Sequence, residues 1–116
     1  MCYIYHMTPE GDLVKSCLEY LAAKKIFAWR QNTMGVFDPS KGVYRKFTGL
    51  PGVSDILGII NVGGVGRFFS CECKIKPRKP TEDQELFMEK VTENGGYALL
   101  VYSIDELEKD IVELLA

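Results

Sequence analysis

The chain opens with a helical pattern of apolar residues. Between residues 8 and 25 these residues recur every three or four positions, at Leu13, Val14, Cys17, Leu18, Leu21 and Ala22. The spacing predicts an amphipathic helix of about four turns. Thr8 suits the N-cap because its hydroxyl can accept a backbone hydrogen bond, and Pro9 suits the first helical position.

The middle of the chain consists of β-like runs broken by turns. Residues 54–60 and 67–75 predict two strands, and the glycine-rich segment 61–66 between them predicts a hairpin turn. Upstream of this hairpin, residues 26–30 predict a strand, residues 32–42 predict a loop, and residues 43–47 predict a further strand.

The last third predicts a helix, a strand and a second helix. Thr81 suits the N-cap of the first helix, and residues 94–96, Asn-Gly-Gly, suit its end. The apolar stripe expected to face inward is Leu86, Phe87, Met88 and Val91. Residues 97–102 predict a buried strand, and residues 103–115 predict a helix whose inward positions are Ile104, Leu107, Ile111 and Leu114.

We expect a core of the order α-β-β-β-α-β-α, an α/β fold with a central mixed β-sheet flanked by helices. The 116 residues suffice for one domain, 1–116. The longest nearly uncharged stretch, residues 56–66, contains four glycines and is too short to span a bilayer. The first residues also lack the features of a signal peptide, so we expect a cytoplasmic protein without a membrane segment.

The charges are unevenly distributed along the chain. The formal net charge is only −2, but residues 24–79 hold eleven basic and three acidic residues. A basic region of this kind is typical of a surface that faces a polyanion such as DNA. The three acids are Asp38, Asp55 and Glu72, and their scarcity indicates a specific role.

The four cysteines, Cys2, Cys17, Cys71 and Cys73, lack the paired spacing of a zinc site. The chain contains a single histidine, His6. We therefore interpret the cysteines as free thiols that pack as small apolar side chains. A zinc or redox protein built on these cysteines is the less favoured alternative.

The candidate chemistry lies in the predicted hairpin. Strand alternation places Ser70, Glu72, Lys74 and Lys76 on one face. Antiparallel pairing through the glycine turn can bring Asp55 beside Glu72. The competing interpretation is an ordinary solvated polar face, since the tripeptide Glu-x-Lys is common.

Two carboxylates and a lysine at one sheet edge suit phosphodiester cleavage. Asp55 and Glu72 can hold Mg²⁺ or Mn²⁺ through hard oxygen ligands, and the backbone carbonyl of Cys73 can add another. Such an ion polarises a phosphate and lowers the pKa of a bound water. Lys74 can orient that water and offset the charge of the transition state.

The chain resembles the VRR-NUC family, the virus-type replication-repair nucleases. The resemblance spans about residues 10–107 and rests on ordered motifs at residues 27–33, 35–42, 52–58, 72–74, 81–84 and 94–97. It implies a restriction-endonuclease-like PD-(D/E)xK core with Asp55 and Glu72 as metal ligands and Lys74 as catalytic lysine. Ser54 stands where this superfamily often has proline, and its side chain is expected to point away from the metal.

By the same resemblance Glu10 would complete the metal site, either directly or through water, and Gln84 would support Lys74 or the attacking water. Both residues have alternatives. A helix dipole also favours an acid at position 10, and Glu19 competes for the role of Glu10. Gln84 lies three residues after Thr81, which is the spacing of a capping box.

The predicted function is a metal-dependent DNA endonuclease that acts on branched DNA such as four-way (Holliday) junctions. The resemblance implies a homodimer, and we expect its interface in residues 33–50, with Phe37, Val43, Tyr44 and Phe47. We interpret the aromatics, Trp29 included, as core or interface side chains. A catalytically silent DNA-binding module is the alternative. The candidate DNA contacts are Arg30, Asn32, Lys41, Arg45, Lys46, Lys76, Arg78 and Lys79.

Overall fold

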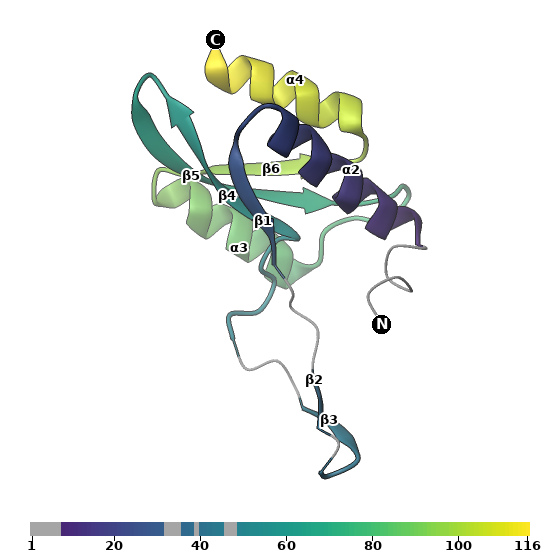
Figure 1. Cartoon of the computed structure of the whole chain (residues 1–116). Helices are drawn as coiled ribbons and strands as arrows, with labels where there is room; N and C mark the ends of the chain where they lie inside the picture. The colour runs from purple at the N-terminus through teal and green to yellow at the C-terminus, as the bar shows by residue number, and fades with distance from the viewer. Residues whose placement is uncertain (1–7, 32–35, 39, 46–48) are drawn as a thin grey trace.

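The computed structural model describes residues 8–31, 36–38, 40–45 and 49–116. In this part of the chain, three helices and a four-stranded sheet form the main body (Figure 1). The helices are α2 (Pro9–Ala23), α3 (Glu82–Glu93) and α4 (Ile104–Leu115). The strands of the main sheet are β1 (Phe27–Arg30), β4 (Ile56–Val62), β5 (Val65–Cys73) and β6 (Tyr97–Val101).

The main sheet has the order β1-β4-β5-β6 and is mixed. β1 and β5 pair antiparallel with β4, whereas β6 pairs parallel with β5. The predicted class, an α/β fold with a mixed sheet and flanking helices, is therefore confirmed. None of the helices in the described ranges has the length and apolar character needed to cross a membrane.

A separate two-stranded sheet lies between β1 and β4 in the sequence. It pairs β2 (Val36–Asp38) antiparallel with β3 (Val43–Arg45). The prediction of a loop throughout residues 32–42 was wrong at β2, because a hairpin with a short turn needs only three residues in each strand. The predicted second strand agrees with β3.

The helix boundaries follow from their capping residues. The side chains of Thr8, Thr81 and Ser103 each accept a backbone hydrogen bond in the first turn of α2, α3 and α4. The acceptor oxygen satisfies an amide that has no partner within the helix. At the end of α3, Gly95 adopts a positive φ of 86°, as the predicted stop requires.

The core lies between one face of the sheet and the helices α2 and α4 (Figure 1). From the helices it takes Val14, Cys17, Leu21, Leu107 and Ile111, and from the sheet it takes Ile56, Ile60, Phe69, Cys71, Cys73, Leu99 and Val101. Phe69 is paired with Gly58, and a Cβ at Gly58 would lie 2.6 Å from the Phe69 ring. A glycine is thus needed where this ring covers β4.

The opposite face of the sheet is only partly covered. Helix α3 packs on β5 and β6 and buries Val91, but Leu86 stays half exposed. The prediction that Leu86 faces the core was wrong, since α3 contacts the sheet through a narrower stripe than the apolar pattern indicates. Beyond α3, the cross-strand row Phe27–Ile59–Phe68 is exposed, with Phe27 at 66%.

The turn between β4 and β5 is tighter than predicted. The ladder continues to the pair Val62–Val65, so only Gly63 and Gly64 form the turn. Both have a positive φ, at 60° and 87°. This is the backbone of the two-residue hairpin turn that matches the natural twist of antiparallel strands.

Gly52 fixes the segment that leads into β4. Its φ is +74°, and a Cβ at this position would overlap the backbone carbonyl of Asp83 in the first turn of α3. The chain before Asp55 therefore packs directly on the start of α3. No larger residue fits without moving one of these two segments.

We predict that Gly52→Ala destabilises the protein more than Gly63→Ala does. Gly63 has a similar φ but open space around its Cβ position, so its substitution adds only backbone strain, about 1–2 kcal/mol. Gly52→Ala should add an overpacking cost of about 1–3 kcal/mol. Urea unfolding of both variants measures the difference, and equal losses would contradict the close packing at Gly52.

Candidate functional site

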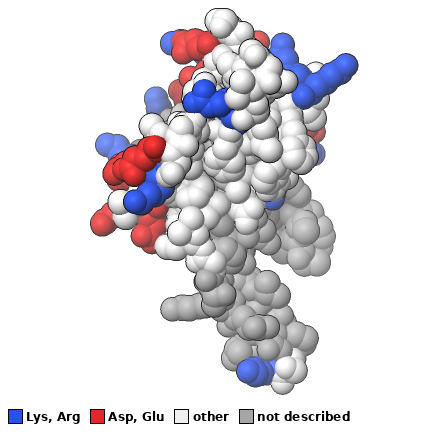
Figure 2. Space-filling view, turned by 90° about the vertical axis from the view of Figure 1, so that its left-hand side faces the viewer, with Lys and Arg blue, Asp and Glu red and all other residues white. Residues whose placement is uncertain are grey.

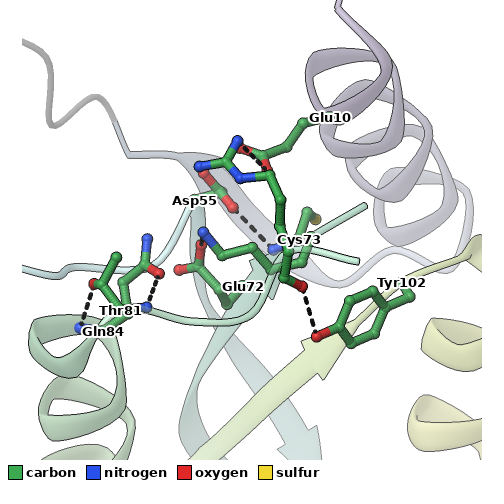
Figure 3. Close-up of polar contacts among 9 residues, drawn as sticks. Glu10, Asp55, Glu72, Cys73, Thr81, Gln84 and Tyr102 are labelled. Atoms are coloured by element: carbon green, nitrogen blue, oxygen red, sulfur yellow. Dashed lines mark hydrogen bonds and ion pairs between the residues drawn. The ribbon is translucent and has the colours of Figure 1, made fainter. Parts of the chain in front are cut away.

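The candidate site lies where β5 and β6 end and β4 begins. Because Ile56 pairs with Cys71, Asp55 falls opposite Glu72, on the face of the sheet away from the main core. Figure 3 shows the Asp55 and Glu72 side chains next to each other in this position. The predicted convergence of Asp55, Glu72 and Lys74 is therefore present in the structure.

The Asp55 carboxylate is held by the backbone of β5. The Cys73 amide donates to Asp55 Oδ2 at 2.9 Å. The Gln31 amide, just after β1, donates to the Asp55 carbonyl at 2.8 Å. In a strand, the N–H and C=O of one residue point to the same side. The Cys73 carbonyl therefore also faces the Asp55 side.

Glu72 and Lys74 are buried rather than solvated. Their residues are 1% and 2% exposed, which excludes the alternative of an ordinary polar surface. Lys74 Nζ lies 3.8 Å from Glu72 Oε2, too far for a hydrogen bond. Glu72 Oε1 is buried and has no hydrogen-bond partner. A buried carboxylate oxygen in this state has a strong tendency to bind a cation or a proton.

The surroundings of Glu72 favour its protonated form. Burial is the main cause that raises the pKa of Glu72 from its ordinary value of 4.5 to about 8, and the negative charge of Asp55 acts in the same direction. Lys74 opposes the shift, while a hydrogen-bonding contact with Asp55 and the charge of Glu10 add to it. The carboxyl group of Glu72 therefore holds its proton more tightly than a solvated carboxyl group does.

Glu10 approaches the site from the first turn of α2. Its side chain points toward Asp55 (Figure 3), and Arg78 Nη1 lies 3.7 Å from Glu10 Oε1. Glu19 is exposed and nine residues further along α2, which corresponds to about 13 Å. Of the two predicted candidates, Glu10 is the one at the site.

Gln84 forms the capping box that its spacing predicts. Its side-chain oxygen accepts from the Thr81 amide at 2.8 Å, and its own amide donates to Thr81 Oγ1 at 3.2 Å. Figure 3 shows this pair at the start of α3, on the same side as Glu72. The capping box uses the oxygen of Gln84, and its side-chain nitrogen remains for other partners. The family-derived role of Gln84 stays a prediction.

The candidate DNA contacts are only partly covered by the structure. Lys76, Arg78 and Lys79 are exposed in the loop after β5, and Lys41 is exposed after β2. Arg30 is half-buried at the end of β1. On the face in Figure 2, Lys and Arg alternate with Asp and Glu around a broad uncharged area and do not form one basic patch.

Other predictions fall outside the described residues. Asn32 and Lys46 lie there, as do Phe47, Cys2 and His6. The structure describes only the backbone of Arg45 and of three predicted interface residues, Phe37, Val43 and Tyr44.

The described residues contain no group of three His, Cys, Asp or Glu side chains that could hold a metal ion by themselves. A metal at this site would therefore depend on Asp55 and Glu72 together with backbone and water oxygens. Cys17, Cys71 and Cys73 are free and buried, as predicted. They line the core side of β5, opposite to the acids.

Sequence reasoning missed the contribution of Tyr102, which follows β6. Its hydroxyl donates to the Arg78 carbonyl at 3.1 Å and so joins two segments 24 residues apart. No local pattern signals such a contact, because it depends on where the loop after β5 folds back.

Comparisons of the chain with protein-family models, curated proteins and solved structures found no match.

We predict that metal-free protein loses stability as the pH rises from about 4.5 to about 8. The folded-state pKa of Glu72 lies above its ordinary value, so over this range the folded state keeps a proton that the unfolded state has lost. The stability present at low pH is thus lost as the pH passes through the raised pKa, at no more than about 1.4 kcal/mol per pH unit.

The measurement is urea unfolding in EDTA at several pH values, for wild type and Glu72→Gln. The glutamine cannot ionise, so the difference in slope between the two proteins isolates Glu72. Identical slopes would show that Glu72 titrates normally in the folded protein.

Proposed function

We propose that this chain is a divalent-metal-dependent DNA endonuclease of the PD-(D/E)xK type. The observation that carries the proposal is the pair of carboxyl groups at Asp55 and Glu72, with Glu72 Oε1 buried and without a hydrogen-bond partner. Lys74 lies on the same strand end, 3.8 Å from Glu72. This donor set and lysine suit metal-assisted phosphodiester hydrolysis.

The residues present fit a hard cation such as Mg²⁺ or Mn²⁺. Asp55 and Glu72 would hold it, the Cys73 carbonyl faces the same side, and water would complete the shell, since Mg²⁺ keeps several waters. A cation at Glu72 would also take the place of the proton that burial favours there. When bound, the ion supplies a water of lowered pKa and polarises the phosphate.

The protein's own groups prepare the site. The Cys73 amide keeps the Asp55 carboxylate in one orientation, which reduces the reorganisation needed on binding. Lys74 carries its charge in a place from which water is excluded, so its interaction with a phosphate oxygen would be strong. In this proposal Lys74 orients the attacking water and offsets the growing negative charge.

DNA is the proposed substrate because of the basic loop beside the site and the VRR-NUC resemblance. Lys76, Arg78 and Lys79 lie in the loop after β5 and are exposed. Contacts from such residues go to phosphates and are independent of base sequence. Branched DNA, such as a four-way junction, and a homodimer are the finer parts of the proposal and rest on the resemblance alone. Two symmetric incisions need two copies of a one-site chain.

We predict that the protein cuts DNA only in the presence of Mg²⁺ or Mn²⁺. The measurement is a panel of labelled linear, flapped, nicked and four-way DNA with each metal and with EDTA. The four-way junction should be cut fastest. Metal-independent cutting, or binding without cutting in either metal, would contradict the proposal, and the second result would favour a silent DNA-binding module.

Substitutions separate the roles of the three residues. Asp55→Asn should abolish metal-dependent cutting, and Lys74→Met, which keeps the packing of the buried stem, should lower its rate by about 10²–10³-fold. Both variants should bind the junction nearly as well as wild type in EDTA. Equal loss of binding and cutting in Lys74→Met would mean that Lys74 is a phosphate contact only.

A further inference from the structure

The loop that follows β5 is fixed by three contacts. The Arg78 amide donates to the Ile75 carbonyl at 3.0 Å, and the Tyr102 hydroxyl donates to the Arg78 carbonyl at 3.1 Å. Lys76 Nζ lies 5.8 Å from the centre of the Tyr102 ring, within cation–π range. The backbone of an exposed, basic loop is thereby held in one position, and Tyr102 makes two of the three contacts.

The side chain of Arg78 is held only loosely. It is 66% exposed, and its Nη1 lies 3.7 Å from Glu10 Oε1, which is beyond hydrogen-bond distance. Glu10 Oε1 itself is buried and has no hydrogen-bond partner. An exposed ion pair of this length contributes little to stability. The Arg78–Glu10 attraction therefore keeps Arg78 close to Glu10 without a hydrogen bond between them, so the N–H donors of Arg78 are available to another acceptor.

The pair lies next to the acids of the proposed active site. Glu10 points toward Asp55, and Tyr102 lies on the other side of Cys73 (Figure 3). A phosphate that approaches Asp55 and Glu72 would therefore arrive within reach of Arg78. The planar guanidinium matches two phosphate oxygens at once, which a lysine cannot do.

We propose that Arg78 contacts the phosphate that is cut, that Glu10 keeps Arg78 near the acids before DNA binds, and that Tyr102 positions the loop. This inference rests on the proposed nuclease function and deepens it. In this inference Glu10 is the partner of Arg78 and is not a metal ligand. Arg78 also differs from the other basic residues, whose phosphate contacts would lie further along the DNA.

The experiment compares Arg78→Gln with Lys90→Gln. Lys90 is a matched control, since it forms an equally loose, exposed ion pair, 3.8 Å from Glu93 near the far end of α3. Binding of a labelled four-way junction is measured in EDTA at several salt concentrations, and cutting is measured at saturating DNA in Mg²⁺. Circular dichroism establishes that each variant is folded.

Arg78→Gln should lower the slope of log K against log salt by about 0.9, the value for one lost phosphate contact. It should also lower the cutting rate by about 10²-fold or more, as does the loss of one transition-state donor. Arg78→Lys should keep the wild-type salt dependence of binding but not the wild-type cutting rate. Tyr102→Phe, which keeps the ring, should reduce the rate by a smaller factor, and Lys90→Gln should change neither quantity.

Glu10→Gln distinguishes the two roles of Glu10. As a positioning residue, it should leave the Mg²⁺ concentration for half-maximal cutting unchanged; a large increase would return Glu10 to the metal and overturn this part of the inference. An Arg78→Gln variant that matches Lys90→Gln in slope and rate would overturn the role of Arg78.

The two proposals can fail separately. Cutting by wild type together with unchanged Arg78→Gln behaviour would overturn the inference and leave the nuclease function intact. Absence of cutting by wild type, with the Arg78-dependent slope retained, would overturn the nuclease function and support Arg78 as a phosphate contact. Absence of both binding and cutting would overturn both.

Discussion

The antiparallel register between β4 and β5 is the constraint on which the candidate site depends. With Ile56 opposite Cys71, the Asp55 carboxylate reaches the Cys73 amide and meets Glu72 on the same face. A slip of one residue would reverse every side chain of β4 and place Asp55 on the core side. The register is fixed by the two-glycine turn and by the fit of Phe69 over Gly58, so core packing and site geometry are set by the same pairing.

The buried polar groups of the site lower the stability of the folded protein. Glu72 and Lys74 are almost fully buried at the sheet end without a mutual hydrogen bond, and Glu72 Oε1 lacks any such partner. Desolvation of two such groups can exceed their attraction for each other. The buried apolar core on the other face of β5 stabilises the same strand. Functional sites often contain buried polar groups that lack hydrogen-bond partners, although the rest of the fold is well satisfied.

Much of the fold could be predicted because its signals are local. Thr8 and Thr81 act as the predicted caps, and the apolar periods of α2 and α4 agree with their buried faces. The opposition of Asp55 and Glu72 could also be predicted, since a hairpin fixes its own register.

Long-range packing accounts for what the pattern missed. The exposure of Leu86 depends on how much of the sheet α3 covers, and the Tyr102–Arg78 contact depends on where two distant segments meet. The capping role of Gln84 could be stated beforehand only as an alternative, because spacing alone does not decide between a cap and a catalytic partner.

The three thiols on the core side of β5 allow local opening of the core to be detected by chemical labelling. Cys17 on α2 and Cys71 and Cys73 on β5 are fully buried, with the sulfurs of Cys17 and Cys73 3.9 Å apart. An alkylating reagent can reach them only when the covering helices separate from the sheet, so their labelling rate reports that motion. Since Cys73 also carries the amide that holds Asp55, the same labelling would follow the loosening of the strand that supports the acids.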